Sequence, residues 1–385
     1  MTPVLLTQIG PPTKRRNRVV ASEPTIGVQE SFISLPGTST KTQSESNVYT
    51  DFDSDVRWIK QTVRADLKTL RPATQGVAHY YLTERIKVLN TTGHGCAAHP
   101  LSPRPIPYLA FWFAHAFGLE DPQVRRLLGL CLVYACLSST PRDDLLDGSA
   151  FAPRQQKYLS DWFWQRYVAT LEKLFDAESS IWQLLSKSKY DWERCDRWVL
   201  SQKRHEAADP LSQAFLRNSS AYLAALIFPT LAGVALLSNR AQKISAIRRF
   251  VSHYCMGWRI LDDWRDWRDD LEANIQSNSV LAFLVIRARI SSRVPLTKQL
   301  VVSVLSDKGV VSRIYSAMAR FCLAARREAA QLHAVYVTRF IDEQLKGYEA
   351  ELARIRTDKE DFRNSLARLL EAAPCASKAL PNKNS

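Results

Sequence analysis

The chain has 385 residues, of which 46% are apolar and only 13 are glycine, and it shows no strand-like alternation of apolar and polar residues. This composition supports a sizeable buried core and predicts an all-α protein of one large or two small domains. The formal net charge of +14 indicates an anionic partner, but the basic residues are scattered among acids, which argues against nucleic acid and favours a small anionic ligand.

Both ends of the chain lack apolar periodicity. Residues 1–50 are rich in Ser, Thr, Pro and Gln, so we expect a disordered tail. A basic cluster at 14–18 would suit a transit peptide, but a flexible tail is the favoured interpretation. The short apolar run at 4–9 ends at two prolines and does not form a secretory signal. Residues 372–385 are expected to form a loose C-terminal tail.

The seven cysteines indicate a reducing compartment. Their number is odd, none forms a Cys-x-x-Cys pair, and several lie in apolar segments, where a free thiol behaves as a small hydrophobe. We therefore expect a cytoplasmic protein. His94 and His99 flank Cys96 like one half of a zinc site, but no second half follows with metal spacing.

Apolar periodicity predicts one helical domain over residues 51–371. The first helix begins near Asp51, and Phe52, Val56 and Ile59 lie on its apolar stripe. The run Tyr222–Leu237 is too short to span a bilayer and contains a proline, so we expect a buried helix and no integral membrane segment. Further helices are expected at 77–90, 105–118, 121–139, 155–175, 192–206, 211–237, 241–271, 279–290, 310–350 and 358–371.

A first acidic cluster consists of Asp143, Asp144 and Asp147, directly after an apolar helix. In an α-helix with about 3.6 residues per turn, Asp143 and Asp147 share one face. A solvated helix start explains such a cluster equally well, because Pro141 can begin a helix whose first turn favours acids.

A second acidic cluster places five aspartates within the nine residues 262–270, among bulky apolar residues. Asp262, Asp266 and Asp270 share one helix face, and stacked like charges destabilise a helix unless cations neutralise them. Mg²⁺ suits this place because it binds one or two carboxylates and lets substrate phosphates complete its shell. The alternative is neutralisation by arginines three or four residues away, namely Arg259, Arg265 and Arg268.

The two clusters resemble motifs of a known family. Asp143 to Asp147 matches the Asp-Asp-x-x-Asp motif of trans-isoprenyl diphosphate synthases and class I terpene synthases, and residues 262–270 resemble their second aspartate motif. Residues 102–118 also resemble the segment before the first motif, and the likeness covers about 55–345. The resemblance implies an isoprenoid-synthase-type helical bundle around a central apolar cavity, three Mg²⁺ ions and an allylic prenyl diphosphate as substrate.

The chain departs from the condensing synthases at the basic residues that bind a second diphosphate. Their Gly-Gly-Lys-x-x-Arg segment corresponds to 98–104, which keeps at most Arg104. The paired arginines after the first motif are absent, since 148–156 offers only Arg154, and Ser219-Ser220 stands near the place of a Lys-Thr pair. A site with fewer cations should hold one diphosphate, which favours cyclisation of one substrate, as in class IB terpene cyclases.

The resemblance also implies roles for individual residues. The catalytic acids would be Asp143, Asp147, Asp262 and Asp266, and the metal ligands would be Asp143, Asp144, Asp147, Asp262, Asp263, Asp266 and Asp270. Arg142, Arg204 and Arg259 are the expected diphosphate partners. Aromatic faces stabilise a carbocation by about 0.5–2 kcal/mol each, and the aromatic candidates are Phe113, Phe117, Tyr134, Trp164, Tyr222 and Trp258, although core packing explains any one of them.

The expected substrate is farnesyl diphosphate, converted to a cyclic sesquiterpene. Ser138 and Ser139 stand where prenyl synthases form the floor of the chain pocket, and their small size would deepen it toward Tyr134, which also permits a C20 substrate. The alternatives are a diterpene cyclase, a condensing trans-prenyltransferase, an Mg²⁺-dependent diphosphate hydrolase, and a non-catalytic helical or membrane-surface protein. The oligomeric state, a homodimer included, stays open.

Overall fold

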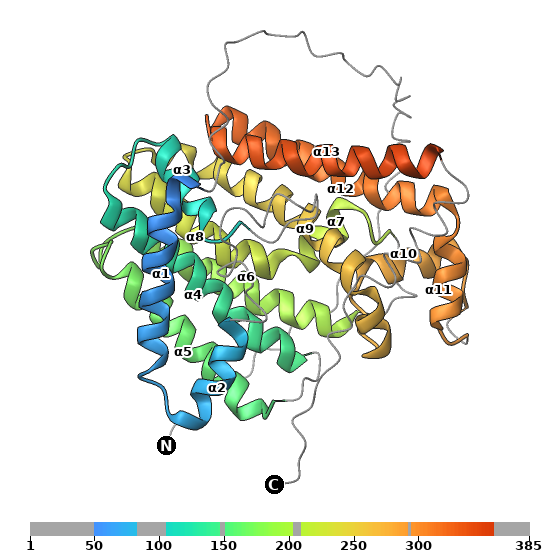
Figure 1. The fold of residues 1–385 in the computed structure, drawn as a ribbon, viewed down its shortest axis with the longest axis horizontal. Coiled ribbons are helices and arrows are strands. Elements are labelled where there is room, and N and C mark those ends of the chain that lie inside the picture. The colour runs from blue at the N-terminus through green and yellow to red at the C-terminus, as the bar shows by residue number, and fades with distance from the viewer. Residues whose placement is uncertain (1–49, 83–104, 147–150, 203–208, 292–293, 358–385) are drawn as a thin grey trace, which may run out of the picture. The chain divides into compact units, whose positions relative to one another are not determined.

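The computed structural model describes residues 50–82, 105–146, 151–202, 209–291 and 294–357, and every regular element in these ranges is helical (Figure 1). The all-α prediction is confirmed. The elements are η1 (Thr50–Phe52), α1 (Asp53–Leu67), α2 (Pro72–Tyr80), α3 (Tyr108–Ala116), α4 (Pro122–Leu146), α5 (Pro153–Leu171), α6 (Ile181–Ser201), α7 (Gln213–Ser219), α8 (Ala221–Leu237), η6 (Ala241–Lys243), α9 (Ile244–Glu272), α10 (Ser279–Arg287), α11 (Lys298–Leu305), α12 (Lys308–Gln331) and α13 (Val335–Thr357).

Helix α8 lies at the centre of the helical unit and contacts α3, α4, α6 and α9. It contains no charged residue, and almost all of its side chains are buried, so it packs against neighbours on every side. The prediction of a buried helix at Tyr222–Leu237 is confirmed. No single described helix is long and apolar enough to cross a membrane; α7 and α8 satisfy that criterion only together, as a pair bent by 71°.

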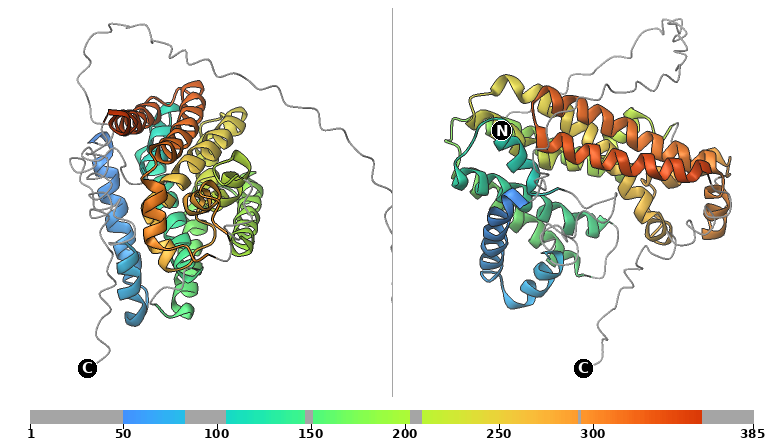
Figure 2. Two further views of the ribbon diagram at one scale, coloured as in Figure 1. Left: turned by 90° about the vertical axis from the view of Figure 1, so that its right-hand side faces the viewer. Right: turned by 45° about the horizontal axis from the view of Figure 1, so that its top comes forward.

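Two helix pairs carry the acidic clusters. Helix α4 packs along α5, and α9 packs along α12, which in turn lies beside α13 (Figure 2). In α9, Phe250, Tyr254 and Ile260 lie on the buried side, and this apolar packing holds the helix in place up to its acidic end. Helices α4 and α9 are both joined to the central α8, which fixes their spacing.

The N-terminal helix α1 is fastened to α4 by a buried charge. The Asp55 carboxylate, with 1% of its side chain exposed, accepts from Arg125 and Arg126 of α4, each at 2.7 Å. Close by, Gly129 of α4 faces α1 and α3. A Cβ atom at this position would lie 2.4 Å from the Phe111 ring and 2.8 Å from Cδ1 of Ile59, so only glycine permits this approach.

The helix boundaries differ from those expected in several places. The segment 211–237 breaks at Ser220 into α7 and α8, and the Ser212 hydroxyl caps the start of the short helix α7. The segment 310–350 divides into α12 and α13 at a turn in which His333 takes φ 56°, a left-handed conformation that ends a helix. Helix α6 begins at Ile181, eleven residues before the expected start at Trp192, and α11 was not expected.

Candidate active site

The described acids of the first cluster lie within a helix and not at its start. Helix α4 continues through Pro141 and is described up to Leu146, so Asp143 and Asp144 follow the proline inside the same helix. The interpretation of these acids as a favourable helix start at Pro141 is therefore wrong. Neighbouring acids in a helix repel each other, and a bound cation would relieve this repulsion.

The turn of α4 before Pro141 is rich in hydroxyls that bond to its own backbone. Ser138 donates to the Ala135 carbonyl at 2.7 Å, and Ser139 and Thr140 both donate to the Cys136 carbonyl. Such bonds satisfy buried hydroxyls within the helix and relax its geometry next to a proline, which lacks an N–H. The helix thereby remains continuous up to Arg142 and Asp143.

The second cluster lies in the last turns of α9. The helix ends at Glu272, and Asn274 then takes φ 57° while the Ile275 N–H bonds to the Asp270 carbonyl at 2.8 Å. This is a common way to end a helix, with a left-handed residue and a bond back over the last turn. Of the pocket acids in α9, Asp270 lies in this last turn, near the negative end of the helix dipole.

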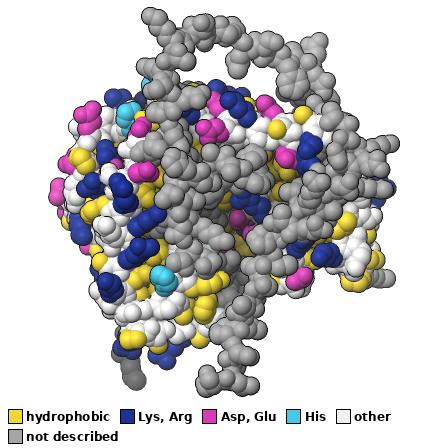
Figure 3. Space-filling model, in the orientation of Figure 1, with side chains coloured by type: hydrophobic (Ala, Val, Ile, Leu, Met, Phe, Trp, Pro, Cys, Tyr) yellow, Lys and Arg dark blue, Asp and Glu magenta, His cyan; other side chains and the backbone are white. Residues whose placement is uncertain are grey.

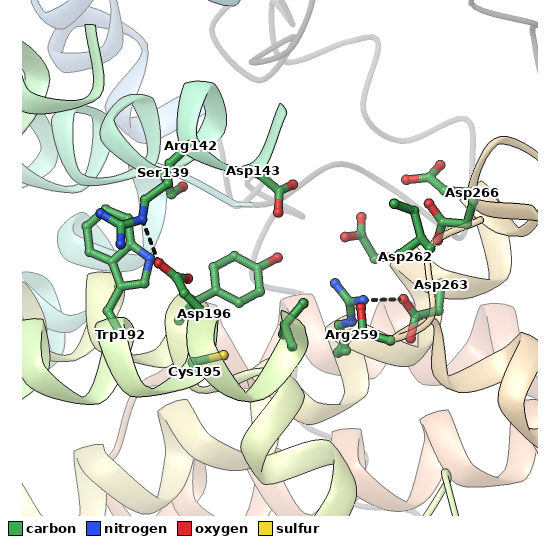
Figure 4. Close-up of a pocket in the computed structure, with 15 residues that line it drawn as sticks. Ser139, Arg142, Asp143, Trp192, Cys195, Asp196, Arg259, Asp262, Asp263 and Asp266 are labelled. Carbon is green, nitrogen blue, oxygen red and sulfur yellow. Dashed lines mark hydrogen bonds and ion pairs between the residues drawn. The ribbon is translucent and has the colours of Figure 1, made fainter. Parts of the chain in front are cut away.

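One pocket brings the two clusters together. Asp143 lines it from α4, and Asp262, Asp263, Asp266 and Asp270 line it from α9, around a cavity of about 70 Å³. In the close-up, the carboxylate of Asp143 points across the gap toward Asp262 and Asp266 (Figure 4). The other lining residues are Ser139, Arg142, Trp192, Cys195, Asp196, Val199, Tyr222, Arg259, Ile275 and Ser277.

Six aspartates and two arginines line the pocket. The space-filling view shows acidic and basic side chains next to each other in a recess near the middle of its face, while elsewhere the two signs are scattered (Figure 3). Among the described lining residues the cations are Arg142 and Arg259, and each is paired with an aspartate. The net charge of the described lining is therefore negative, and it suits cations better than a bare anion.

Arg259 and Asp263 form an ion pair within α9. The Arg259 Nη2 atom lies 2.9 Å from Oδ1 of Asp263, whose side chain is 2% exposed. The N–H of Ser279 donates to the other carboxylate oxygen at 2.8 Å, and the Ser279 hydroxyl donates to the same atom. Burial raises the pKa of Asp263 to about 7, against the lowering effect of the neighbouring guanidinium. The proposed neutralisation of acids by i±4 arginines is thus observed for Arg259 and Asp263.

Arg142 and Asp196 form a second ion pair, between α4 and α6. Arg142 Nε donates to Asp196 Oδ2 at 2.5 Å, and its guanidinium lies 5.1 Å from the ring centroid of Trp192. Burial raises the pKa of the Asp196 carboxyl, while Arg142 lowers it. This pair fixes the residue immediately before Asp143, and so it helps to aim that carboxylate into the pocket.

The remaining acids of the prediction are placed differently. Asp144 is buried and does not line the pocket. Asp147 and Arg204 lie outside the described residues. Asp270 lines the pocket, and one of its oxygens accepts from Asn278 Nδ2 at 2.6 Å.

The donors of the pocket fit a hard divalent cation. In the described ranges, no three His, Cys, Asp or Glu side chains are grouped to hold a metal ion by themselves. Mg²⁺ requires no such cage, since it keeps waters and combines one or two carboxylates with phosphate oxygens of a substrate. The opposed carboxylates of Asp143, Asp262 and Asp266 offer oxygen ligands of that kind.

Most of the aromatic candidates lie in the packed core. Of the six, only Tyr222 lines the acidic pocket. Phe113 packs against Phe117 and Phe250 at centroid distances of 6.0 and 5.2 Å. Trp164 packs against Tyr167 and Trp192, and Trp258 lines a separate cavity of about 10 Å³.

The pocket does not deepen toward Tyr134 as expected. The Tyr134 hydroxyl donates to Asp66 of α1, and its ring packs on Phe163, so neither Tyr134 nor Ser138 lines the cavity. Ser138 is fully buried, and its carbonyl accepts from Ser160 of α5 at 2.6 Å. Of the two serines expected at the pocket floor, Ser139 lines the pocket and Ser138 does not.

The wall that α6 contributes was not predicted. Trp192, Cys195 and Asp196 line the pocket from this helix, and Ile275 and Ser277 do so from the segment after α9. Trp192 and Asp196 are four residues apart and share a face, but such spacing is common in a helix of mixed polarity and does not indicate a site. The partner of Asp196 is 54 residues away in the sequence, and no local signal identifies it.

No family model and no curated protein sequence matches this chain. Several solved structures are similar to this chain. A decaprenyl diphosphate synthase from Rhodobacter capsulatus has a TM-score of 0.60 and 13% identity, covering 78% of this chain and 98% of that one. A polyprenyl synthase from Caulobacter crescentus, complexed with calcium and isoprenyl diphosphate, has a TM-score of 0.59 and 14% identity, covering 80% and 98%.

The chain has the isoprenoid synthase fold. A geranylgeranyl pyrophosphate synthase from Lactobacillus brevis agrees, with a TM-score of 0.60, 14% identity and coverage of 77% of this chain and 98% of that one. The fold implied by the sequence resemblance is thereby confirmed. At these identities the similarity defines an isoprenoid synthase fold, and the reaction has to be argued from the pocket itself.

Proposed function

We propose that this protein is an Mg²⁺-dependent terpene cyclase that ionises one allylic prenyl diphosphate and cyclises the carbocation, with release of diphosphate. The observation that carries this proposal is the pocket shared by Asp143 and Asp262. Two helices direct carboxylates into one cavity, where the aspartates outnumber the arginines, and bound cations would offset the remaining negative charge. Divalent cations held there would bind a diphosphate between the two walls.

The facing acids and one arginine of the pocket have roles in this proposal. Asp143, Asp262 and Asp266 would hold the cations, together with Asp147 beyond the described end of α4. When bound, Mg²⁺ neutralises the negative charge that develops on the diphosphate as the carbon–oxygen bond breaks. Arg259 would donate to the same diphosphate oxygens, and three Mg²⁺ ions are proposed from the family resemblance.

The apolar side of the pocket would protect the carbocation. Tyr222 and Trp192 line the same cavity as the acids. An aromatic face stabilises a cation by about 0.5–2 kcal/mol, and bulky rings exclude water that would otherwise trap the cation as an alcohol. A carbon–carbon double bond of the same chain then supplies the electron pair that closes the ring, and loss of a proton ends the reaction.

The small number of basic side chains around the pocket favours cyclisation over condensation. The described lining contains two arginines, and both have aspartate partners. Arg154 is exposed at the start of α5 and does not line the pocket, and Ser219 and Ser220 are buried without charge. The described lining therefore supports one diphosphate rather than two; residues 98–104 lie outside the described ranges.

Farnesyl diphosphate remains the proposed substrate. This choice follows from the sequence resemblance, and a cyclic sesquiterpene is the proposed product.

A chain-elongating prenyltransferase is the second candidate. It is favoured by one observation, namely that the similar solved structures carry the names of decaprenyl, polyprenyl and geranylgeranyl diphosphate synthases. Such an enzyme would lengthen farnesyl diphosphate when isopentenyl diphosphate is added, and it would form no cyclic hydrocarbon.

Product analysis separates these functions. The purified protein is incubated with Mg²⁺ and C10, C15 or C20 diphosphates, with and without isopentenyl diphosphate, and the extracts are analysed by gas chromatography and mass spectrometry. We expect a cyclic C15 hydrocarbon from farnesyl diphosphate alone. A longer linear diphosphate would support the second candidate, whereas turnover of the C20 diphosphate alone would overturn the substrate assignment. Release of phosphate with farnesol alone would indicate a hydrolase.

A further inference from the structure

The aspartates of the second cluster differ in their surroundings although they lie on one helix. Asp262 is half-buried and Asp266 is exposed, and both point toward Asp143. Asp263 is buried, and both of its carboxylate oxygens are occupied by protein donors. The cluster therefore does not act as a uniform set of metal ligands.

The start of α10 supplies the donors for Asp263. Ser279 is the first residue of that helix, and its backbone N–H reaches the carboxylate at 2.8 Å. The N-terminal end of a helix carries partial positive charge, so it stabilises a buried carboxylate at this position. The Ser279 hydroxyl adds a second bond to the same oxygen.

Asn278 joins this helix start to the acidic end of α9. Its Oδ1 atom accepts from the Leu281 N–H at 2.8 Å and so caps α10. Its Nδ2 group donates to the Asp263 carbonyl at 3.0 Å and to Oδ2 of Asp270 at 2.6 Å. Asn278 is fully buried, and it fixes the register between α10 and the last two turns of α9.

Arg259 is the group that this network orients. Its side chain lines the pocket, and its Nη2 atom is tied to Asp263. Its Nε atom is buried and has no hydrogen-bond partner among the described residues. A buried donor without a partner is costly, and an anionic oxygen bound in the pocket would satisfy it.

We propose that Asp263, Asn278 and Ser279 form a positioning unit that holds the Arg259 guanidinium ready for a diphosphate oxygen. In this assignment Asp262 and Asp266 face the metal ions, whereas Asp263 orients Arg259 and binds no metal. Asp263 is thus a positioning residue. The inference rests on the proposed function only in that the pocket binds diphosphate with a divalent cation.

Inorganic pyrophosphate and Mn²⁺ test this division without any turnover. Mn²⁺ binding is counted by electron paramagnetic resonance, and pyrophosphate affinity is measured by calorimetry in saturating Mn²⁺. For Asp263→Asn we expect the wild-type number of bound Mn²⁺ ions and a pyrophosphate affinity about tenfold to a hundredfold weaker, as for loss of other outer-shell partners. Asp262→Asn, the matched variant one residue away, should lose Mn²⁺ itself.

A double-mutant cycle identifies the route of the effect. If Asp263 acts through Arg259, the variant Asp263→Asn with Arg259→Gln binds pyrophosphate no more weakly than Arg259→Gln alone. Additive losses would overturn the proposal, and so would loss of Mn²⁺ in Asp263→Asn to the extent seen for Asp262→Asn. Circular dichroism verifies that each variant is folded.

Ser279→Ala provides a milder variant if Asp263→Asn does not fold. It removes the hydroxyl donor but leaves the backbone N–H, so we expect a smaller loss of pyrophosphate affinity, again absent in the Arg259→Gln background. An unchanged affinity in Ser279→Ala would count against the positioning unit. If the wild-type protein binds pyrophosphate with Mn²⁺ but makes no cyclic product, the proposed function fails while this inference stands. If the wild-type protein binds neither, both fail.

Discussion

Asp143 and Asp262 line one pocket from the C-terminal parts of two different helices, and the carboxylate of Asp143 points toward Asp262 across the gap. Like charges that face each other across one pocket repel each other. The arrangement is therefore costly in the protein alone, and it becomes favourable once cations are bound.

Removing a pocket acid should stabilise the metal-free protein. In buffer with EDTA, we expect Asp266→Asn to raise the free energy of unfolding by about 0.3–1 kcal/mol, because repulsion with its neighbours and with the helix end is relieved. The measurement is urea unfolding followed by circular dichroism. Asp269→Asn is the matched control, since Asp269 lies in the same turns of α9 but does not line the pocket.

The two variants should differ once ligand is present. Mg²⁺ with pyrophosphate should raise the melting temperature of wild type and Asp269→Asn, because binding to the folded state alone stabilises it. Asp266→Asn should show a much smaller increase. Equal increases in all three proteins would contradict a role for Asp266 in cation binding.

The buried Asp55 should contribute more to the free energy of unfolding than either arginine that pairs with it. Asp55→Ala leaves two guanidinium groups without their shared acceptor and separates α1 from α4, and we expect a loss of about 2–3 kcal/mol in the free energy of unfolding. Arg125→Ala should cost only about 1 kcal/mol, because Arg126 still pairs with the carboxylate. Chemical unfolding measures both changes. Equal losses in the two variants would argue against one carboxylate that is shared by both arginines.

Two glycines in helices should respond oppositely to alanine. Gly129→Ala would place a methyl group against Phe111 and Ile59, and such overpacking costs about 1–3 kcal/mol. Gly76 is exposed in α2, and a Cβ atom there would meet no other atom within 4 Å, so Gly76→Ala should stabilise by about 0.5–1 kcal/mol. Thermal unfolding of both variants decides whether close approach at Gly129 holds α1, α3 and α4 together.

His253 should add a pH dependence to stability. Burial lowers its pKa in the folded protein; Glu328 opposes this, while Arg327, Arg217 and Arg249 add to it. The unfolded chain therefore takes up the proton first, so stability is lost as the pH falls below about 6.5. The free energy of unfolding of wild type minus that of His253→Gln should decrease from about pH 7.5 to about pH 5.5. Parallel pH profiles of wild type and His253→Gln would show that protonation of His253 does not change the free energy of unfolding.

Sequence patterns predicted the all-α class, because apolar periodicity together with scarce glycine is typical of helical proteins. The junctions were harder to predict. Ser220 and His333 interrupt segments that are apolar on both sides, and the bends there depend on packing against α6, α9 and α3 that no local pattern contains. Pro141 suggested a helix start where none exists, since α4 continues through it.

The acidic half of the pocket could be predicted and the rest could not. The spacing of Asp262 and Asp266 indicates a shared helix face by itself, and a second aspartate motif suggests an opposing wall. The different environment of Asp263 depends on Ser279, sixteen residues later, and on where α10 begins. The positions of Tyr134 and Trp258 likewise depend on tertiary packing, and an aromatic residue on an apolar helix is equally suited to core and pocket.

The central claim is that both acidic walls act together on one diphosphate, and calorimetric titration with inorganic pyrophosphate in excess Mg²⁺ tests it most directly. The account predicts that wild type and Asp269→Asn bind, that binding disappears with EDTA, and that Asp143→Asn and Asp262→Asn each lose at least about tenfold in affinity. Binding that persists without metal, or that is unchanged by loss of either wall, would contradict it.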